Sequence, residues 1–263
     1  MKPVFQVKKI FIMDKNNNNI AMLIDGDNAQ PKLLEYILEE ASKYGKVTIR
    51  RIYGDWTHPG MSGWKNLLND LSFSPIQKFN YTTGKNSTDS SLIIDAMDIL
   101  HDKTVDGFCI VSSDSDYTGL AKRIREAGVF VMGIGEKKTP NAFVQSCEIF
   151  TYSENLLPKS VKTKGKVDGK ETKKSMESSV EDSKGLKKKE QKLIDRAFEI
   201  SVGEEEEAYI STVGSNLRKL NPSFDTRAYG YRNLTQLFKN LKTYQVINNN
   251  VNGLNHPLVK KAE

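Results

Sequence analysis

The stretch "IAMLIDGDN" at residues 20–28 decides the fold, because an uninterrupted apolar run leads directly into an acid. Such a run is typical of a strand buried on both faces, as in a parallel sheet covered by helices. The acid, Asp25, then lies at the carboxyl end of the strand. Ligands of open α/β sheets bind beyond that end of the strands. The sequence therefore predicts a central strand that ends at a binding site.

Strand-like and helix-like segments alternate from this stretch to about residue 152. The predicted strands are 20–25, 46–54, 75–80, 107–113, 129–135 and 148–152, and the predicted helices are one that begins at Pro31 and others near 61–71, 88–102, 117–127 and 140–146. Strands that alternate with helices favour a parallel sheet with right-handed crossovers. We therefore expect an α/β fold with helices on both faces of the sheet.

The composition changes after residue 158, where Lys, Ser, Glu and Gly replace large apolar residues. A segment of this kind cannot bury enough surface to offset its ordering entropy, which predicts a flexible linker. Helical periodicity returns afterwards and ends in a hairpin turn at Asn252-Gly253, as in a small winged-helix domain. The predicted divisions are an extension over 1–19, an α/β domain over 20–154, a linker over 155–185 and a winged-helix domain over 186–263.

The composition of the sequence indicates in which cellular compartment the protein works and which kinds of partner it binds. No apolar run approaches the roughly 18 residues of a membrane helix, so we expect no membrane partner. The two cysteines, Cys109 and Cys147, lie in apolar surroundings, which favours reduced core residues in a cytoplasmic protein. The net charge of +6 weakly favours a polyanionic partner.

Acidic residues gather in three motifs: "DGDN" at 25–28, Asp89 at the start of a predicted helix, and "SSDSD" at 112–116. If the first and fourth strands are neighbours, the first and third motifs face one crevice. Asp89 shares a helical face with apolar residues such as Leu92, and a lone carboxylate buried there would be costly without a cation. Clustered carboxylate oxygens suit Mg²⁺ or Mn²⁺.

A simpler interpretation of these acids stays open. Aspartates at strand ends often cap helices or form turns. Asp25 or Asp27 could cap the helix that begins at Pro31, and Asp89 could interact favourably with a helix dipole. The three motifs together, each at an end of an element, favour a metal site over three separate caps.

These residues resemble the NYN branch of the PIN-like nucleases, which includes the LabA-like proteins. The resemblance covers about 20–152 through "LIDGDN", "GKNSTDSSLIIDAMD", "VSSDSDYTGLAKRIREAG" and "VFVMGIG". It implies a PIN-like parallel sheet sandwiched by helices and metal-dependent hydrolysis of RNA. The residues it implies as catalytic and as ligands of Mg²⁺ or Mn²⁺ are Asp25, Asp89, Asp114 and Asp116. "GKNSTD" is longer than the usual turn of the family, and Asp95 falls where the helix often carries a further acid.

Contacts with the substrate can be assigned around these acids. Asn28 matches the asparagine of the first family motif, and Ser112 and Ser113 belong to the third motif. We expect these three residues and Lys85 to bind the substrate, and Arg50 and Arg51 are further candidates for guiding phosphates. For each basic residue, an ordinary surface charge is an equally good interpretation.

Residues from about 186 to 260 resemble a LOTUS domain, also called OST-HTH. The specific part is "FDTRAYGY" at 224–231. The resemblance implies binding of RNA, which we expect to be single-stranded, or in some members docking to another protein. Arg227, Tyr229 and Tyr231 are the expected RNA contacts, although the two tyrosines could instead pack the small core.

The leading prediction is therefore a metal-dependent endoribonuclease with a C-terminal RNA-binding module. Two other classes stay open. One is an RNA-binding regulator whose acids hold a metal without turnover. The other is a phosphatase of the haloacid dehalogenase type, in which "DGD" at 25–27 supplies a nucleophilic aspartate and its acid partner.

Overall fold

The computed structural model describes residues 18–78, 87–157, 186–203, 206–251 and 254–262. The chain divides into two compact units, Met1–Cys147 and Glu148–Glu263. Most of the predicted extension and linker, together with Lys85, lies outside the described residues. Within the described part of the chain, no helix is both long and apolar enough to cross a membrane.

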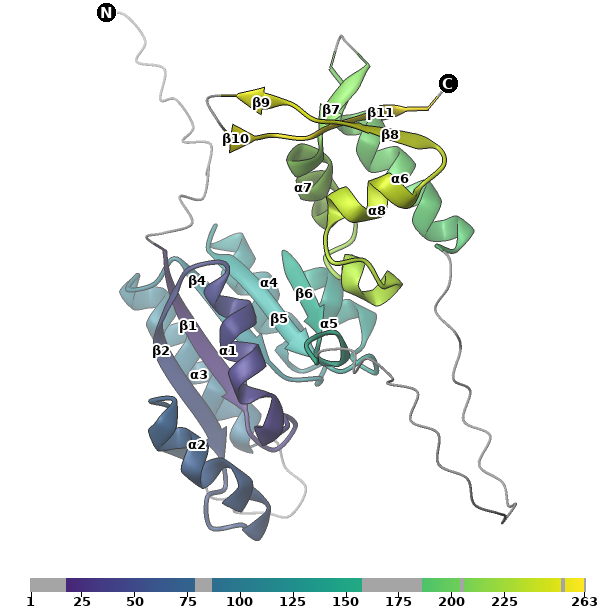
Figure 1. Cartoon of the computed structure of the whole chain (residues 1–263). Coiled ribbons are helices and arrows are strands. Elements are labelled where there is room, and N and C mark those ends of the chain that lie inside the picture. Colours follow the sequence, from purple (N-terminus) through teal and green to yellow (C-terminus); the bar gives the residue numbers. More distant parts are fainter. Residues whose placement is uncertain (1–17, 79–86, 158–185, 204–205, 252–253, 263) are drawn as a thin grey trace, which may run out of the picture. The chain divides into compact units, whose positions relative to one another are not determined.

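A six-stranded parallel sheet with helices on both faces forms the α/β fold, as predicted (Figure 1). Its strands are β1 (Asn19–Asp25), β2 (Lys46–Gly54), β3 (Ser74–Gln77), β4 (Gly107–Val111), β5 (Phe130–Gly135) and β6 (Ile149–Tyr152). The order across the sheet is β3-β2-β1-β4-β5-β6. The chain therefore builds one half outward from β1, then crosses over and builds the other half from β4.

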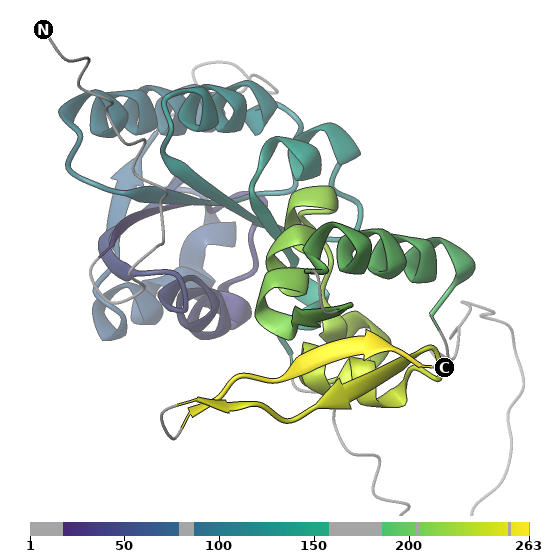
Figure 2. The same ribbon diagram turned by 90° about the horizontal axis from the view of Figure 1, so that it is seen from above.

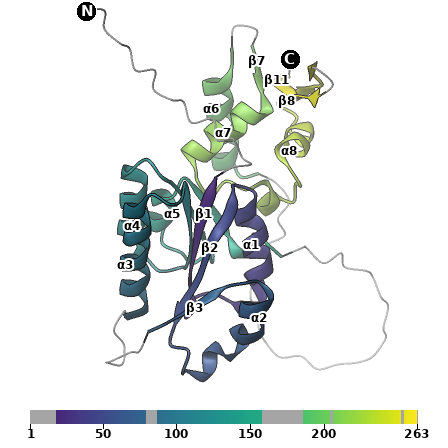
Figure 3. The same cartoon turned by 90° about the vertical axis from the view of Figure 1, so that its left-hand side faces the viewer.

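Helices cover both faces of the sheet, as Figure 3 shows edge-on. The helical segments are η1 (Pro31–Leu33), α1 (Leu34–Ser42), η2 (Pro59–Trp64), α2 (Lys65–Asp70), α3 (Ser87–Asp102), α4 (Tyr117–Glu126), α5 (Asn141–Ser146) and η3 (Ser153–Asn155). α1 and α2 lie on one face, and α3 and α4 lie side by side on the other. α3 makes the crossover from β3 to β4.

The central strand β1 pairs in parallel with both β2 and β4. Residues 21–24 are completely buried, as the uninterrupted apolar run predicted. Asp25 lies opposite Tyr53 of β2, and Ile24 lies opposite Val111 of β4. β1 and β4 are thus the neighbours at which the strand order reverses, which confirms the assumption that brings the first and third acidic motifs to one crevice.

Gly26 allows the chain to turn closely after β1. Its N–H donates to the carbonyl of Tyr53 at 2.8 Å. A Cβ at this position would come within 2.8 Å of the same carbonyl oxygen and within 2.8 Å of Cε of Met61. Only glycine avoids both contacts, so the "DG" of the first motif fixes the path that the following loop takes.

The second unit contains a winged-helix domain built from helices and a small antiparallel sheet. Its elements are α6 (Lys188–Ser201), β7 (Glu207–Tyr209), α7 (Ile210–Leu220), η4 (Thr226–Tyr229), α8 (Leu234–Asn240), β8 (Tyr244–Ile247), β9 (Asn250–Val251), β10 (Leu254–Asn255) and β11 (Leu258–Lys261). The sheet has the order β7-β11-β8, and β9 pairs with β10 (Figure 2, yellow strands). The predicted turn at 252–253 lies outside the described residues, between these paired strands.

This small domain has a core of its own. Ile194, Val213, Leu217, Leu237 and Val259 are completely buried, and they come from all three helices and from β11. The sequence did not predict β7, which adds an edge strand to the hairpin.

Candidate metal centre

Asp25 is the last residue of β1, and its side chain is completely buried. Its Oδ2 accepts hydrogen bonds from Nδ2 of Asn28 at 2.7 Å and from Oγ of Ser112 at 2.9 Å. Its Oδ1 accepts the backbone N–H of Asp27 at 3.2 Å. Asn28 and Ser112, two expected substrate contacts, therefore orient the carboxylate of Asp25.

Asp89, Asp114 and Asp116 form the cluster next to it. Each offers a carboxylate oxygen, and these oxygens lie within 4.8 Å of one another. Asp89 comes from the first turn of α3, whereas the other two come from the loop between β4 and α4. The expected acids of the second and third motifs thus do converge, although they are 25 or more residues apart in sequence.

Hydrogen bonds within the β4–α4 loop fix the two acids of the third motif. The N–H of Asp114 donates to Oγ of Ser112 at 3.1 Å, and the N–H of Asp116 donates to Oδ1 of Asp114 at 3.0 Å. Oγ of Ser112 also donates to Asp25, so one hydroxyl group links two of the four acids. Ser113 faces the next loop, where its Oγ accepts the N–H of Glu136 at 2.9 Å.

The electrostatics of the centre favour a cation. Burial raises the pKa of Asp25 above its ordinary value, and the nearby charges of Asp89 and Asp27 raise it further against the hydrogen bonds that lower it. Burial also raises the pKa of Asp89, and the carboxylates of Asp114 and Asp116 add to the effect. Like charges at such distances disfavour each other's ionised form, and a divalent cation would remove that penalty.

The helix-cap interpretation of the first motif is wrong. The residue that precedes η1 is Gln30, and η1 has no side-chain cap. Asp27 instead accepts a hydrogen bond from Oγ1 of Thr88 at 3.0 Å, which connects the loop after β1 to the start of α3. Hydrogen bonds thus connect the first motif to α3 through Thr88 and to the third motif through Ser112.

The candidate basic residues on β2 have other partners. Arg51 forms an ion pair with Asp95 at 2.6 Å, and the hydroxyl of Tyr53 also donates to Asp95. Asp95 is thus bound to β2 and does not belong to the cluster. Arg50 donates to the carbonyl of Leu71 at 2.8 Å and stabilises a turn.

Tyr117 also contacts the centre, a role that its sequence context did not predict. Its buried hydroxyl donates to Oδ1 of Asp89 at 2.6 Å. The signal in the sequence was its position directly after "SSDSD", because the first turn of a helix beginning there must lie next to the acids.

The expected RNA contacts of the second unit have mixed environments. Arg227 forms a close ion pair with Asp225 at 2.8 Å, and Tyr229 lies 5.7 Å from Phe224 between ring centroids. Tyr231 is partly buried and packs against the core of the domain. Tyr229 is also partly buried, and burial raises its pKa to about 12. The packing role that the sequence left open therefore applies at least to Tyr231.

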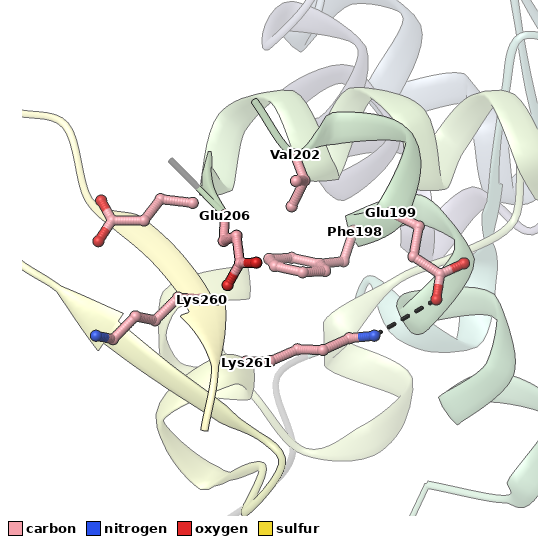
Figure 4. Close-up of a pocket in the computed structure, with 7 residues that line it drawn as sticks. Phe198, Glu199, Val202, Glu206, Lys260 and Lys261 are labelled. Carbon is pink, nitrogen blue, oxygen red and sulfur yellow. Dashed lines mark hydrogen bonds and ion pairs between the residues drawn. The ribbon is translucent and has the colours of Figure 1, made fainter. Parts of the chain in front are cut away.

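A pocket of about 440 Å³ lies elsewhere in this unit (Figure 4). Phe198 and Val202 of the α6 end form its apolar wall. Its charged rim includes Glu199, whose carboxylate lies 3.5 Å from Nζ of Lys261. None of Arg227, Tyr229 and Tyr231 lines it.

Comparison with protein families agrees with this geometry. The family model of the NYN domain matches residues 19–154, which is more than half of the chain. The chain belongs to the NYN family. Membership suggests a nuclease, because the family is generally nuclease-like, and this NYN protein has an acidic cluster formed by Asp89, Asp114 and Asp116. The OST-HTH/LOTUS domain model matches residues 181–255 and suggests RNA binding.

Individual proteins add little to this assignment. No curated protein matches the NYN chain. A crystal structure of a protein of unknown function from Vibrio parahaemolyticus is 22% identical, with a TM-score of 0.44, and the match covers 53% of this chain and 94% of that one. A solution structure of an uncharacterized protein from Nitrosomonas europaea is 24% identical, with a TM-score of 0.28 and coverage of 37% and 93%.

Proposed function

We propose that this NYN protein is a metal-dependent endoribonuclease that hydrolyses phosphodiester bonds of RNA in the cytoplasm. The observation that carries the proposal is the convergence of Asp89, Asp114 and Asp116 within 4.8 Å, next to the buried Asp25. Three carboxylates this close together repel one another, and a bound divalent cation would offset that repulsion.

The donor set fits Mg²⁺ or Mn²⁺. Its ligand atoms are carboxylate oxygens, and no histidine or cysteine belongs to the cluster found among the described residues. Hard oxygen donors of this kind suit Mg²⁺ or Mn²⁺ better than Zn²⁺. The residues proposed to hold the ion are Asp89, Asp114 and Asp116, with Asp25 as the fourth acid. When bound, such an ion can activate water and neutralise charge that develops at phosphorus.

The other residues of the centre orient the acids and face the substrate. Asn28 and Ser112 fix the rotation of the Asp25 carboxylate through two hydrogen bonds to Oδ2. Ser112 also fixes the backbone of Asp114. These two residues and Ser113 are proposed to approach the RNA, since they line the same end of the sheet as the acids.

The OST-HTH domain is proposed to bind single-stranded RNA and keep it near the nuclease. Tyr229 and Arg227 are the proposed contacts, since an aromatic ring can stack on a base and a guanidinium can approach a phosphate. Tyr231 is a weaker candidate because it packs against the core. Docking to another protein is the alternative role of this domain.

The haloacid dehalogenase alternative has less support. A nucleophilic aspartate needs an oxygen that can attack phosphorus in line. Asp25 is completely buried, and both of its carboxylate oxygens accept hydrogen bonds from the protein. Asp27, the proposed acid partner, is bound to Thr88.

Cleavage assays on mixed RNAs with Asp25→Asn and Asp116→Asn test the proposal. Each substitution keeps the size of the side chain and removes one charge, so each should lower the rate more than about a hundredfold. EDTA should abolish the activity of the unsubstituted protein. Asp98→Asn is the matched control, because Asp98 is an exposed acid on α3 outside the cluster, and it should cleave normally.

Two outcomes would contradict the proposal. If both variants kept full activity that EDTA still abolishes, the active site would be elsewhere. If the folded protein bound RNA but never cleaved it with Mg²⁺ or Mn²⁺, the non-catalytic regulator would be the better description. Circular dichroism spectra of each variant control for unfolding.

A further inference from the structure

Tyr117 is placed so that its hydroxyl meets the acidic centre while its ring belongs to the core. It is the first residue of α4, directly after Asp116, and it is completely buried. Its ring lies 6.3 Å from that of Phe143 between centroids. Burial of the ring fixes the position of the hydroxyl at the edge of the cluster.

The hydroxyl makes one short hydrogen bond to an acid of the cluster. It donates to Oδ1 of Asp89 at 2.6 Å. A hydrogen bond to one oxygen of a carboxylate fixes the rotation of the group, so the other oxygen also keeps one direction. The bond joins α3 to α4, and therefore joins the acid of the second motif to the helix that follows the third.

Tyr117 acts in this bond as a donor. An ionised carboxylate offers only hydrogen-bond acceptors, so the hydroxyl of Tyr117 supplies the proton of its bond to Asp89.

We propose that Tyr117 is a positioning residue of the metal centre: its hydroxyl holds Asp89 in the orientation in which Asp89 shares an ion with Asp114 and Asp116. This inference rests on the proposed function only in requiring that the centre binds a divalent metal. Groups that orient a metal ligand typically contribute tenfold or more to metal affinity.

Replacing Tyr117 by phenylalanine tests the effect of the hydroxyl on Asp89 without changing the packing of the ring. Tyr117→Phe keeps the buried ring and its contact with Phe143 and removes only the hydroxyl. Tyr53→Phe is the matched control, because Tyr53 is equally buried and its hydroxyl also donates to an aspartate of α3, Asp95. Asp95 does not belong to the cluster, so the control removes a comparable hydrogen bond away from the metal.

The experiment is a calorimetric titration of the full chain and both variants with Mn²⁺. We expect the dissociation constant of Tyr117→Phe to rise about tenfold and that of Tyr53→Phe to stay unchanged. Equal affinities of the full chain and Tyr117→Phe would overturn the inference, and so would an equal loss in both variants. Absence of Mn²⁺ binding by the full chain would overturn both this inference and the metal-dependent function.

Cleavage kinetics give a second, independent readout. At limiting Mn²⁺, Tyr117→Phe should cleave more slowly with an unchanged KM for RNA, and excess Mn²⁺ should restore kcat. A loss of activity that excess metal does not restore would overturn the positioning role. If Mn²⁺ binds and Tyr117→Phe weakens it, but no variant or parent cleaves RNA, the proposed function fails while the positioning role stands.

Discussion

At the scale of one residue, Asp89 illustrates how unfavourable it is to ionise a carboxylate in this centre when no metal ion is bound. Its carboxylate is partly buried, and Asp114 and Asp116 contribute like charges. The hydrogen bond from Tyr117 offsets only part of the penalty, since the pKa of Asp89 is still raised. An acid whose pKa is higher in the folded than in the unfolded chain stabilises the fold at low pH, and that contribution is lost as pH rises through the folded-state pKa.

We therefore predict that Asp89→Asn stabilises the metal-free protein at pH 7. The amide carries no charge, and its oxygen can still accept the hydroxyl of Tyr117. The melting temperature should exceed that of the parent by a few degrees, and the difference should shrink as pH falls toward 3.8, the ordinary pKa of the acid. Thermal unfolding by circular dichroism at several pH values measures this.

Added Mn²⁺ should make the melting temperature of the parent higher than that of Asp89→Asn. An ion that binds only the folded state raises the melting temperature, so the parent should gain stability at millimolar Mn²⁺ while Asp89→Asn gains little. A lower melting temperature for metal-free Asp89→Asn at pH 7 would show that repulsion within the cluster is unimportant.

The sequence predicted the acids of the centre better than the residues that hold them. Asp25 and Asp114 were recognisable because Asp25 ends one buried strand and Asp114 comes shortly after another, and parallel strands end at one edge of a sheet. The role of the Tyr117 hydroxyl could not be recognised in the same way, because an aromatic residue in the first turn of a helix looks like an ordinary core residue. The ion pair between Arg51 and Asp95 could not be predicted either, because the two residues lie 44 positions apart in sequence.

At the scale of elements, the close approach of the loop after β1 to the end of β2 positions the first motif. Gly26 passes against the carbonyl of Tyr53, and no side chain fits between them. By contrast, Gly119 lies exposed within α4, where a Cβ would meet nothing within 4 Å.

Alanine at these two glycines should therefore have opposite effects. Gly26→Ala forces the backbone of the first motif to shift and should destabilise the protein by about 1–3 kcal/mol. Gly119→Ala should stabilise it by about 0.5–1 kcal/mol, because alanine has the better helix propensity. Urea unfolding of both variants measures the difference, and equal stabilities would contradict the close approach at Gly26.

Element types were predictable wherever burial imposed a strong pattern. β1 and β4 are buried on both faces, and their apolar runs had no alternative interpretation. β7 was missed because its three residues, "EAY", carry no periodicity, and only pairing with β11 makes them a strand.

At the scale of the whole molecule, each family domain has its own core, so we predict that the two can be separated. A fragment of residues 18–157 should keep the centre and cleave RNA but bind it more weakly, because the second module raises the effective concentration of RNA. Residues 186–263 should bind RNA without cutting it, most strongly at low salt. Binding titrations of both fragments at two salt concentrations check this. If the C-terminal fragment binds no RNA at low salt, it is better described as a protein-docking module.

The strand order also determines when the central strand can pair while the protein is being synthesised on the ribosome. β1 is synthesised early, but its partner β4 begins only at Gly107, which is 82 residues after Asp25. One edge of the central strand therefore stays unpaired until β4 has been synthesised. The acids of the centre extend to Asp116. At about 5–20 residues per second, translation takes roughly 5 to 20 seconds to cover that interval. During that time the nascent chain lacks Asp114 and Asp116, so the acidic centre cannot yet assemble.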